Sequence, residues 1–137
     1  MTVVDTGLAA EYAAIYAYSA ATVHLDGDPR WIAEELEAAH RSRRDTLLDF
    51  YDEHGLEAAP PEAGYDIDPV ADAAAAQELL LAIEENVTAT WRAGVAATEP
   101  HEREMCLLMY GESAVTLARW RLGIGQSVAD PWPGRPE

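Results

Sequence analysis

The chain has 137 residues, with 25 acidic side chains against nine basic ones and a formal net charge of −16. This length is typical of one domain with a single core, and so negative a chain repels nucleic-acid backbones and anionic membrane surfaces. We therefore expect a single domain over residues 1–137, and no nucleic acid and no membrane among its partners.

Four helices are predicted, because alanine is abundant, β-branched runs are missing, and Gly and Pro gather between the periodic segments. The first helix should cover about residues 4–25. The second should cover about 29–54, because Asp28 and Pro29 supply an N-cap followed by proline at the first helical position. Gly55 ends this second helix.

Residues 55–68 carry two adjacent prolines, two glycines and no helical period, so they should form an extended connection. The pair Asp68-Pro69 repeats the cap-plus-proline signal and predicts a third helix over about 69–97. A fourth helix should follow over about 100–123, and an extended, Pro-rich C-terminal tail over 129–137.

The loop lengths indicate the topology. Short turns make the first and second helices, and the third and fourth, antiparallel hairpins. Fully extended, the connection of residues 55–68 reaches roughly 46 Å, whereas a helix of about 26 residues is about 39 Å long. The connection can therefore run the whole length of the bundle. The fold class is thus all-α, a ferritin-like four-helix bundle with a long crossover between helices two and three.

Charged residues stand near the middle of each apolar-periodic segment, where a core is expected: Glu11, His40, Glu84 and Glu112. At about 1.5 Å per residue, Glu11 and His40 lie at similar depths below the first turn, as do Glu84 and Glu112 below the second. We therefore expect one central polar cluster. Because a buried carboxylate is costly unless a metal, a cation or hydrogen bonds compensate it, this cluster is the candidate site.

Two interpretations of the cluster remain open. Carboxylate bundles that hold two metal ions take one Glu from each of two helices and Glu-x-x-His from each of the other two. The candidate metal ligands here are Glu11, Glu37, His40, Glu84 and Glu112. Val115 stands where the second His would be, so this iron- or manganese-binding oxidase or metal-handling site would be degenerate.

Arginine offers the other interpretation, because a guanidinium pairs with two carboxylate oxygens at once and repels a metal dication. Arg43 and Arg44 follow His40 by about one turn, and Arg119 lies two turns beyond Glu112. We favour this salt-bridged polar core and expect no resident cofactor, with iron or manganese as the alternative. The sequence identifies no catalytic residues. A small organic ligand in a polar core or pocket is a third interpretation. The proposed cluster consists of Glu11, His40, Arg43, Arg44, Glu84, Glu112 and Arg119.

Three stretches carry a family resemblance: Glu11-Tyr12-Ala13-Ala14-Ile15-Tyr16-Ala17-Tyr18, Ala39-His40-Arg41-Ser42-Arg43-Arg44-Asp45 and Ala118-Arg119-Trp120-Arg121. With the ending Pro131-Trp132-Pro133-Gly134, the chain resembles a ferritin-like family of unknown function, domain of unknown function 4439, over nearly its whole length. The resemblance implies a ferritin-like bundle of bacterial origin that is often paired into a homodimer, and it supplies no activity or ligand. Tyr12 stands where a His is associated with this family, which removes a further nitrogen donor.

Cys106 is the only cysteine, so the chain cannot form an internal disulfide. The sequence shows neither a basic stretch followed by an apolar run at its start nor about 18 continuous apolar residues. We therefore expect a cytoplasmic protein.

Overall fold

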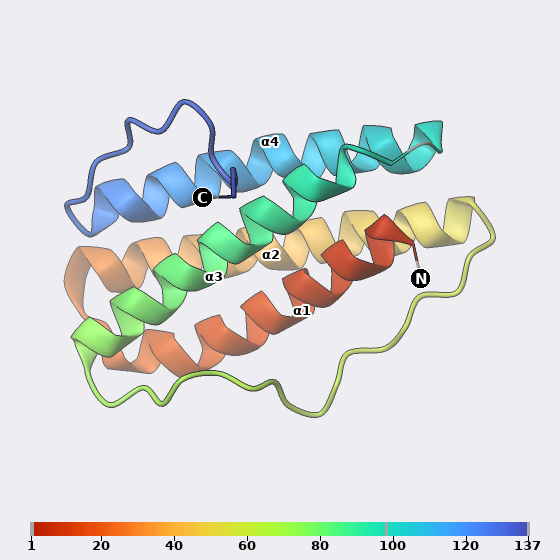
Figure 1. Cartoon of the computed structure of the whole chain (residues 1–137). Coiled ribbons are helices and arrows are strands. Elements are labelled where there is room, and N and C mark those ends of the chain that lie inside the picture. The colour runs from red at the N-terminus through yellow and green to blue at the C-terminus, as the bar shows by residue number, and fades with distance from the viewer. Residues whose placement is uncertain (1, 98, 137) are drawn as a thin grey trace.

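The computed structural model describes residues 2–97 and 99–136, and within them every regular element is a helix. The four long helices are α1 (Val3–Ala21), α2 (Gly27–Glu53), α3 (Ala73–Gly94) and α4 (Pro100–Gly123), and the short 3₁₀ helix η1 (Thr22–His24) follows α1 (Figure 1). The predicted all-helical class and the number of long helices are confirmed. None of the helices described carries an apolar stretch of the length that a membrane crossing requires.

Figure 1 shows how the four helices are connected. α1 and α2 form one antiparallel hairpin, and α3 and α4 form another. The segment between them, residues 54–72, returns along the bundle from the end of α2 to the start of α3 at the opposite end. α3 packs extensively against both α1 and α4, whereas α2 and α4 touch over a smaller area.

A capping box explains where α1 begins. α1 starts one residue early because the Thr2 hydroxyl accepts from the Asp5 backbone while the Asp5 carboxylate accepts from the Thr2 backbone, a capping box. It ends at Ala21, a turn before the predicted end, and η1 completes the hairpin. α2 begins at Gly27, slightly before the predicted Pro29.

The start of α3 differs from the prediction by one turn. Asp72, not Asp68, caps this helix, because its carboxylate accepts a 2.8 Å hydrogen bond from the Ala75 backbone. α3 also ends earlier than predicted, at Gly94. The bounds of α4 agree with the prediction, with Pro100 in the first turn and the Glu99 carboxylate as its cap.

The core has two apolar clusters at opposite ends of the bundle. One contains Leu8, Leu47 and Trp91, and the other contains Leu36 and Trp120. Buried polar and charged side chains occupy the level between them: Glu11, His40, Arg43, Glu84, Thr88, Ser113 and Thr116. The bundle is therefore an apolar core divided by one polar layer.

The buried face of α4 differs from the prediction, which placed Glu112 and Arg119 in the polar core and Val115 at the position of an inward-facing ligand. Leu108 and Val115 are instead 50% and 67% exposed, and Glu112 is exposed as well. The face that packs inward lies about one residue further along the helix: Cys106, Met109, Ser113, Thr116, Leu117 and Trp120. One residue turns a helix by about 100°, so a prediction that is wrong by one residue exchanges an inward face of α4 for one that contacts solvent.

Candidate functional site

Four charged side chains from three helices meet at the centre of the bundle. Glu11 of α1, His40 of α2 and Glu84 of α3 are fully buried, and Arg43 of α2 is 3% exposed. We call these four residues the central cluster. Carboxylates so deep in a core are stable only when positive charge and hydrogen bonds compensate them.

His40 joins the two carboxylates. Its Nδ1 atom lies 2.6 Å from Glu11 Oε2, and its Nε2 atom lies 2.6 Å from Glu84 Oε1. An ionised carboxylate oxygen accepts only, so each ring nitrogen must carry and donate a proton. His40 is therefore an imidazolium cation that links α1 to α3 through α2.

Arg43 supplies the second positive charge. Its Nε atom donates to Glu11 Oε1 over 2.9 Å, and its Nη1 atom lies 3.5 Å from the Thr116 hydroxyl. Its Nη2 atom also lies 2.8 Å from His40 Nδ1. Because that nitrogen already donates its proton to Glu11, the Arg43–His40 approach is a contact of two like charges and not a hydrogen bond. The two carboxylates hold these cations together.

Neutral donors complete the hydrogen bonding of the carboxylates. The Trp91 indole donates to Glu11 Oε1 over 3.0 Å, and the Tyr18 hydroxyl donates to Glu84 Oε1 over 2.6 Å. The Thr116 hydroxyl lies 3.0 Å from Glu84 Oε2 and donates to it. Every carboxylate oxygen of the central cluster thus accepts at least one hydrogen bond, and the donor from the described part of α4 is Thr116.

Trp91 can reach Glu11 because Gly7 leaves room for its ring. A Cβ atom added at Gly7 would stand 2.1 Å from the Trp91 Cη2 atom, well inside contact distance. Spacing along the helices could have pointed to the aromatic donors, since Tyr18 lies two turns beyond Glu11 and Trp91 two turns beyond Glu84. Thr116 was not predicted, because Glu112 and Arg119 were expected on the inner face of α4 in its place.

The electrostatics of the cluster favour its ionised form. Burial by itself lowers the pKa of His40, but the charges of Glu84 and Glu11 and their hydrogen bonds outweigh it and raise this pKa from 6.5 to about 9. Burial likewise opposes ionisation of Glu11 and Glu84, yet hydrogen bonds and the charges of His40 and Arg43 leave both pKa values below the usual one. Burial and the Glu84 carboxylate raise the pKa of Tyr18 far above its usual value, so Tyr18 stays a donor.

Of the seven residues predicted for the polar core, three lie elsewhere. Arg44 pairs with its neighbour Asp45 at the surface. Glu112 is exposed on α4. Arg119 pairs with Glu35 of α2, and its guanidinium lies 5.5 Å from the centre of the Trp31 ring. The prediction that Arg119 neutralises the buried acids is therefore wrong, and Arg43 has that role.

The residues predicted as metal ligands do not all lie together. Of its five predicted members, Glu11, His40 and Glu84 come together, whereas Glu112 faces solvent and Glu37 bonds with Ser19 and Arg41 at the surface. Within residues 2–97 and 99–136, no group of three or more His, Cys, Asp or Glu side chains is placed to hold an ion. The imidazolium form of His40 also leaves no nitrogen lone pair for a metal.

Comparison with known proteins finds solved structures with a similar fold. The chain matches the "crystal structure of a conserved hypothetical protein, rv2844, from Mycobacterium tuberculosis" with a TM-score of 0.78 and 29% sequence identity. The match covers 88% of this chain and 92% of that one. No curated protein matches the chain. The model of one protein family matches residues 3–137, so this chain belongs to the family described as "Domain of unknown function (DUF4439)".

Proposed function

We propose that this protein is a ferritin-like bundle in which a salt-bridged cluster stands where related bundles hold metal, and that it acts as a non-catalytic binding or interaction module. Two hairpins joined by a long return segment are the connectivity of ferritin-like bundles with one crossover. The central cluster lies at mid-height between two apolar clusters, where such bundles place their ligands.

One observation carries the proposal: both ring nitrogens of His40 lie 2.6 Å from ionised carboxylates. An imidazole in this state is a cation and a double donor. It can neither ligate a metal nor accept a proton from a substrate, because both require a free lone pair. The residue that would be the nitrogen ligand of a metal centre is thus engaged in charge balance.

The two positive and two negative charges of the central cluster also balance. Glu11 and Glu84 face His40 and Arg43, and the neutral donors Tyr18, Trp91 and Thr116 complete the hydrogen bonds. A metal dication would have to displace these donors and would meet the Arg43 guanidinium in the same space. The possible metal ligands at this site, Glu11, His40 and Glu84, therefore do not fit the alternative function, an iron- or manganese-dependent oxidase. We derive no redox step for them.

The experiment that tests this proposal combines NMR of His40 with metal binding. In ¹⁵N-labelled protein we expect His40 to show Nδ1–H and Nε2–H signals together at neutral pH, and to keep them until the pH nears 9. Protein purified aerobically without chelator, then supplied anaerobically with Fe(II) or Mn(II), should bind no stoichiometric ion. The His40 signals should not change on adding either metal.

Two variants separate the proposal from its alternative. Glu84→Gln removes one charge of the central cluster and should lower the pKa of His40, whereas Glu112→Gln should leave it unchanged because Glu112 is exposed. The oxidase-type site would be shown to form if metal bound stoichiometrically and abolished the His40 N–H signals, and if Glu112→Gln weakened this metal binding. That result would overturn the proposal.

A further inference from the structure

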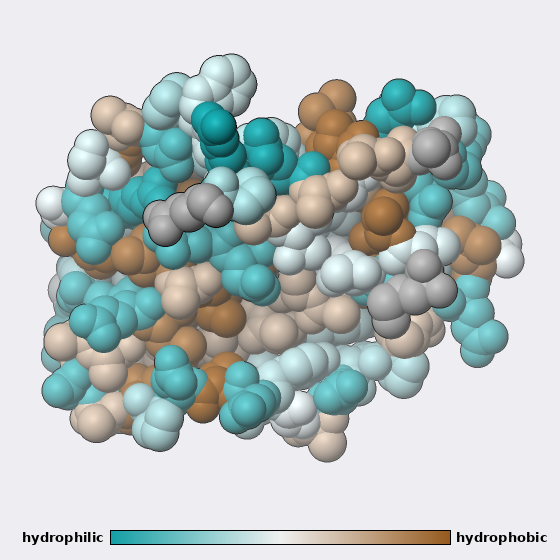
Figure 2. Space-filling view, in the orientation of Figure 1, coloured by the Kyte–Doolittle hydropathy of each residue, from teal (hydrophilic) through white to brown (hydrophobic). Residues whose placement is uncertain are grey.

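One cavity lies away from the central cluster, on the outer side of α3 and α4. It has a volume of about 460 Å³, within the range of small-molecule sites. α3 and α4 form part of its wall, and the segment after α4 forms the rest. Figure 1 shows this segment doubling back over α4, and Figure 2 shows strongly hydrophilic side chains gathered around it.

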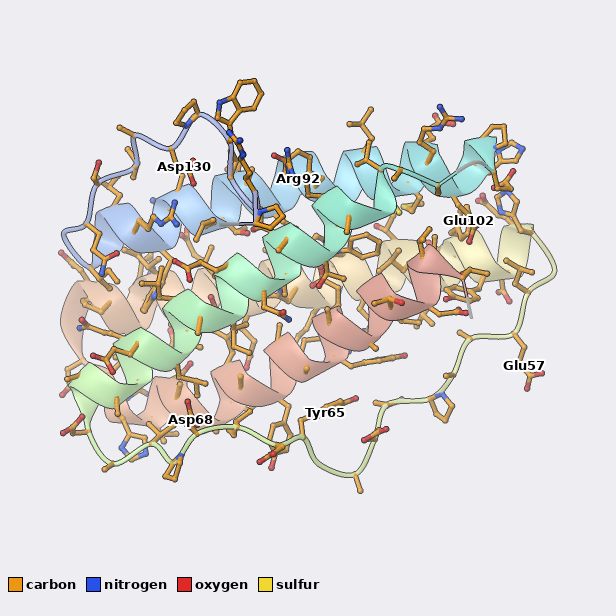
Figure 3. All side chains as sticks on the ribbon, viewed as in Figure 1. Glu57, Tyr65, Asp68, Arg92, Glu102 and Asp130 are labelled. Atoms are coloured by element: carbon orange, nitrogen blue, oxygen red, sulfur yellow. The ribbon has the colours of Figure 1, made fainter. Side chains whose placement is uncertain are left out.

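Positive charge collects at this cavity, although the chain as a whole is acidic. Arg92, Arg121 and Arg135 all line it, a third of the nine basic residues in a chain of net charge −16. Among the residues that the structure describes, the acidic ones of its lining are Glu85 and Asp130, so arginines outnumber acids there by one. Figure 3 shows Arg92 and Asp130 on the same side of the bundle. Basic residues thus outnumber acidic ones in the described lining, whereas acidic residues outnumber basic ones in the whole chain.

Two of the three arginines are available to a ligand. Arg121 is engaged, because its guanidinium lies 3.3 Å from Glu85 and 3.3 Å from Asp130. Arg92 and Arg135 form no ion pair with any residue that the structure describes. Although the chain has 25 acidic residues, none of those in the described part pairs with either guanidinium. The planar, forked donors of these two guanidinium groups match the oxygens of a phosphate or a carboxylate.

The segment after α4 is anchored, which places Arg135 at the cavity. The Tyr110 hydroxyl donates a 2.7 Å hydrogen bond to the Pro133 carbonyl. The next residue, Gly134, has a φ of +74°, and a Cβ atom there would stand 2.9 Å from the Thr88 carbonyl oxygen. Only glycine fits this backbone contact with α3. Arg135 follows it directly and so reaches the cavity from a held position.

We propose that this cavity binds a small organic anion through its phosphate or carboxylate group, with Arg92 and Arg135 as the main contacts and Arg121 beside them. Leu117 and Ala89 give the cavity an apolar wall for the rest of such a molecule. The acidic remainder of the chain does not prevent this, because charges beyond about 8 Å are largely screened at physiological ionic strength. The site is separate from the central cluster, and binding here does not depend on the state of His40.

Inorganic phosphate is the probe for the test. Sodium phosphate is titrated into ¹⁵N-labelled protein, with sodium chloride of equal ionic strength as reference, while the Arg Nε–H signals are followed. We expect saturable shifts at Arg92, Arg121 and Arg135. Arg92→Gln and Arg135→Gln should each weaken binding by about tenfold or more, the effect of losing one charge-assisted contact. Gly134→Ala should also weaken it, although it keeps every arginine.

Arg103→Gln is the matched control, because Arg103 is exposed on α4 and does not line the cavity. It removes the same charge and should leave the Kd for phosphate unchanged. Equal weakening in Arg103→Gln, or no saturable shift with phosphate, would overturn the proposal. Vesicles containing phosphatidic acid offer the same group at a lipid surface, and sedimentation with them in the absence of phosphate binding would overturn it too.

Discussion

Arg43 and Arg119 show that the surroundings of a side chain decide what its charge contributes. Both guanidinium groups pair with a glutamate on another helix. The Arg43–Glu11 pair is buried, whereas in the Arg119–Glu35 pair the side chains are 39% and 42% exposed. Water solvates the exposed pair in both the folded and the unfolded state, so that pair stabilises the fold little. Removing Arg43 leaves carboxylates buried with half of their compensating charge.

We therefore expect Arg43→Leu to lower the free energy of unfolding by about 3 to 5 kcal/mol, because it breaks a buried ion pair. Arg119→Leu should change it by less than about 1 kcal/mol. Urea unfolding followed by circular dichroism measures both. A larger loss in Arg119→Leu than in Arg43→Leu would contradict the assignment of Arg43 as the compensating cation.

All four residues of the central cluster were among those predicted from the sequence, whereas the neutral donors around them were not. His40 and Arg43 of α2 were predicted correctly, because the buried apolar residues of this helix keep one helical period through both positions. α4 has apolar residues on more than one face, and Leu108 and Val115 are exposed although apolar. Periodicity therefore could not tell which face of α4 packs inward. Spacing alone cannot show that Thr116, and not Glu112, reaches Glu84.

At the scale of elements, the start of α3 depends on competing caps. Asp68-Pro69 and Asp72 both offer an aspartate before helix-forming residues, and sequence rules favour the pair with proline. The chain instead stays extended to Asp72, whose carboxylate accepts from the Ala75 backbone. Ile67 and Val70 pack against the apolar cluster around Leu36, and this contact depends on the extended conformation of their segment. Tertiary packing thus outweighed a local signal.

This leads to a prediction for the two aspartates. Asp72→Ala should lower the free energy of unfolding by about 1 kcal/mol, as loss of an N-cap hydrogen bond does. Asp68→Ala is the matched control and should have almost no effect, since Asp68 is exposed and caps no helix. Thermal unfolding of the two variants side by side makes the comparison. Equal destabilisation by both would show that α3 starts at the earlier signal in solution.

For the whole molecule, the central cluster links stability to pH. Because the pKa of His40 is raised from 6.5 to about 9, its contribution is complete below about pH 6.5 and is lost as the pH rises through 9. The lowered pKa values of Glu11 and Glu84 have the opposite consequence. Their contribution is complete above pH 4.5 and is lost as the pH falls through their lowered values.

We expect the free energy of unfolding to be greatest between about pH 5 and 6.5 and to fall by on the order of 3 kcal/mol by about pH 9.5. Urea titrations at stepped pH measure this curve. His40→Gln should lower stability throughout and remove the alkaline decline, because no cation is then left to titrate at that position. If the variant declines toward high pH as steeply as the parent chain, another group is responsible.

The polar layer between the two apolar clusters also fixes the register of the helices along the bundle axis. Apolar side chains can slide past one another by a turn and find new neighbours, whereas the contacts of His40 with Glu11 and Glu84 exist at one height only. A shift of α2 by one turn, about 5.4 Å, would leave four buried charges without partners. The central cluster therefore selects a single register of the helices among the several that apolar packing alone would tolerate.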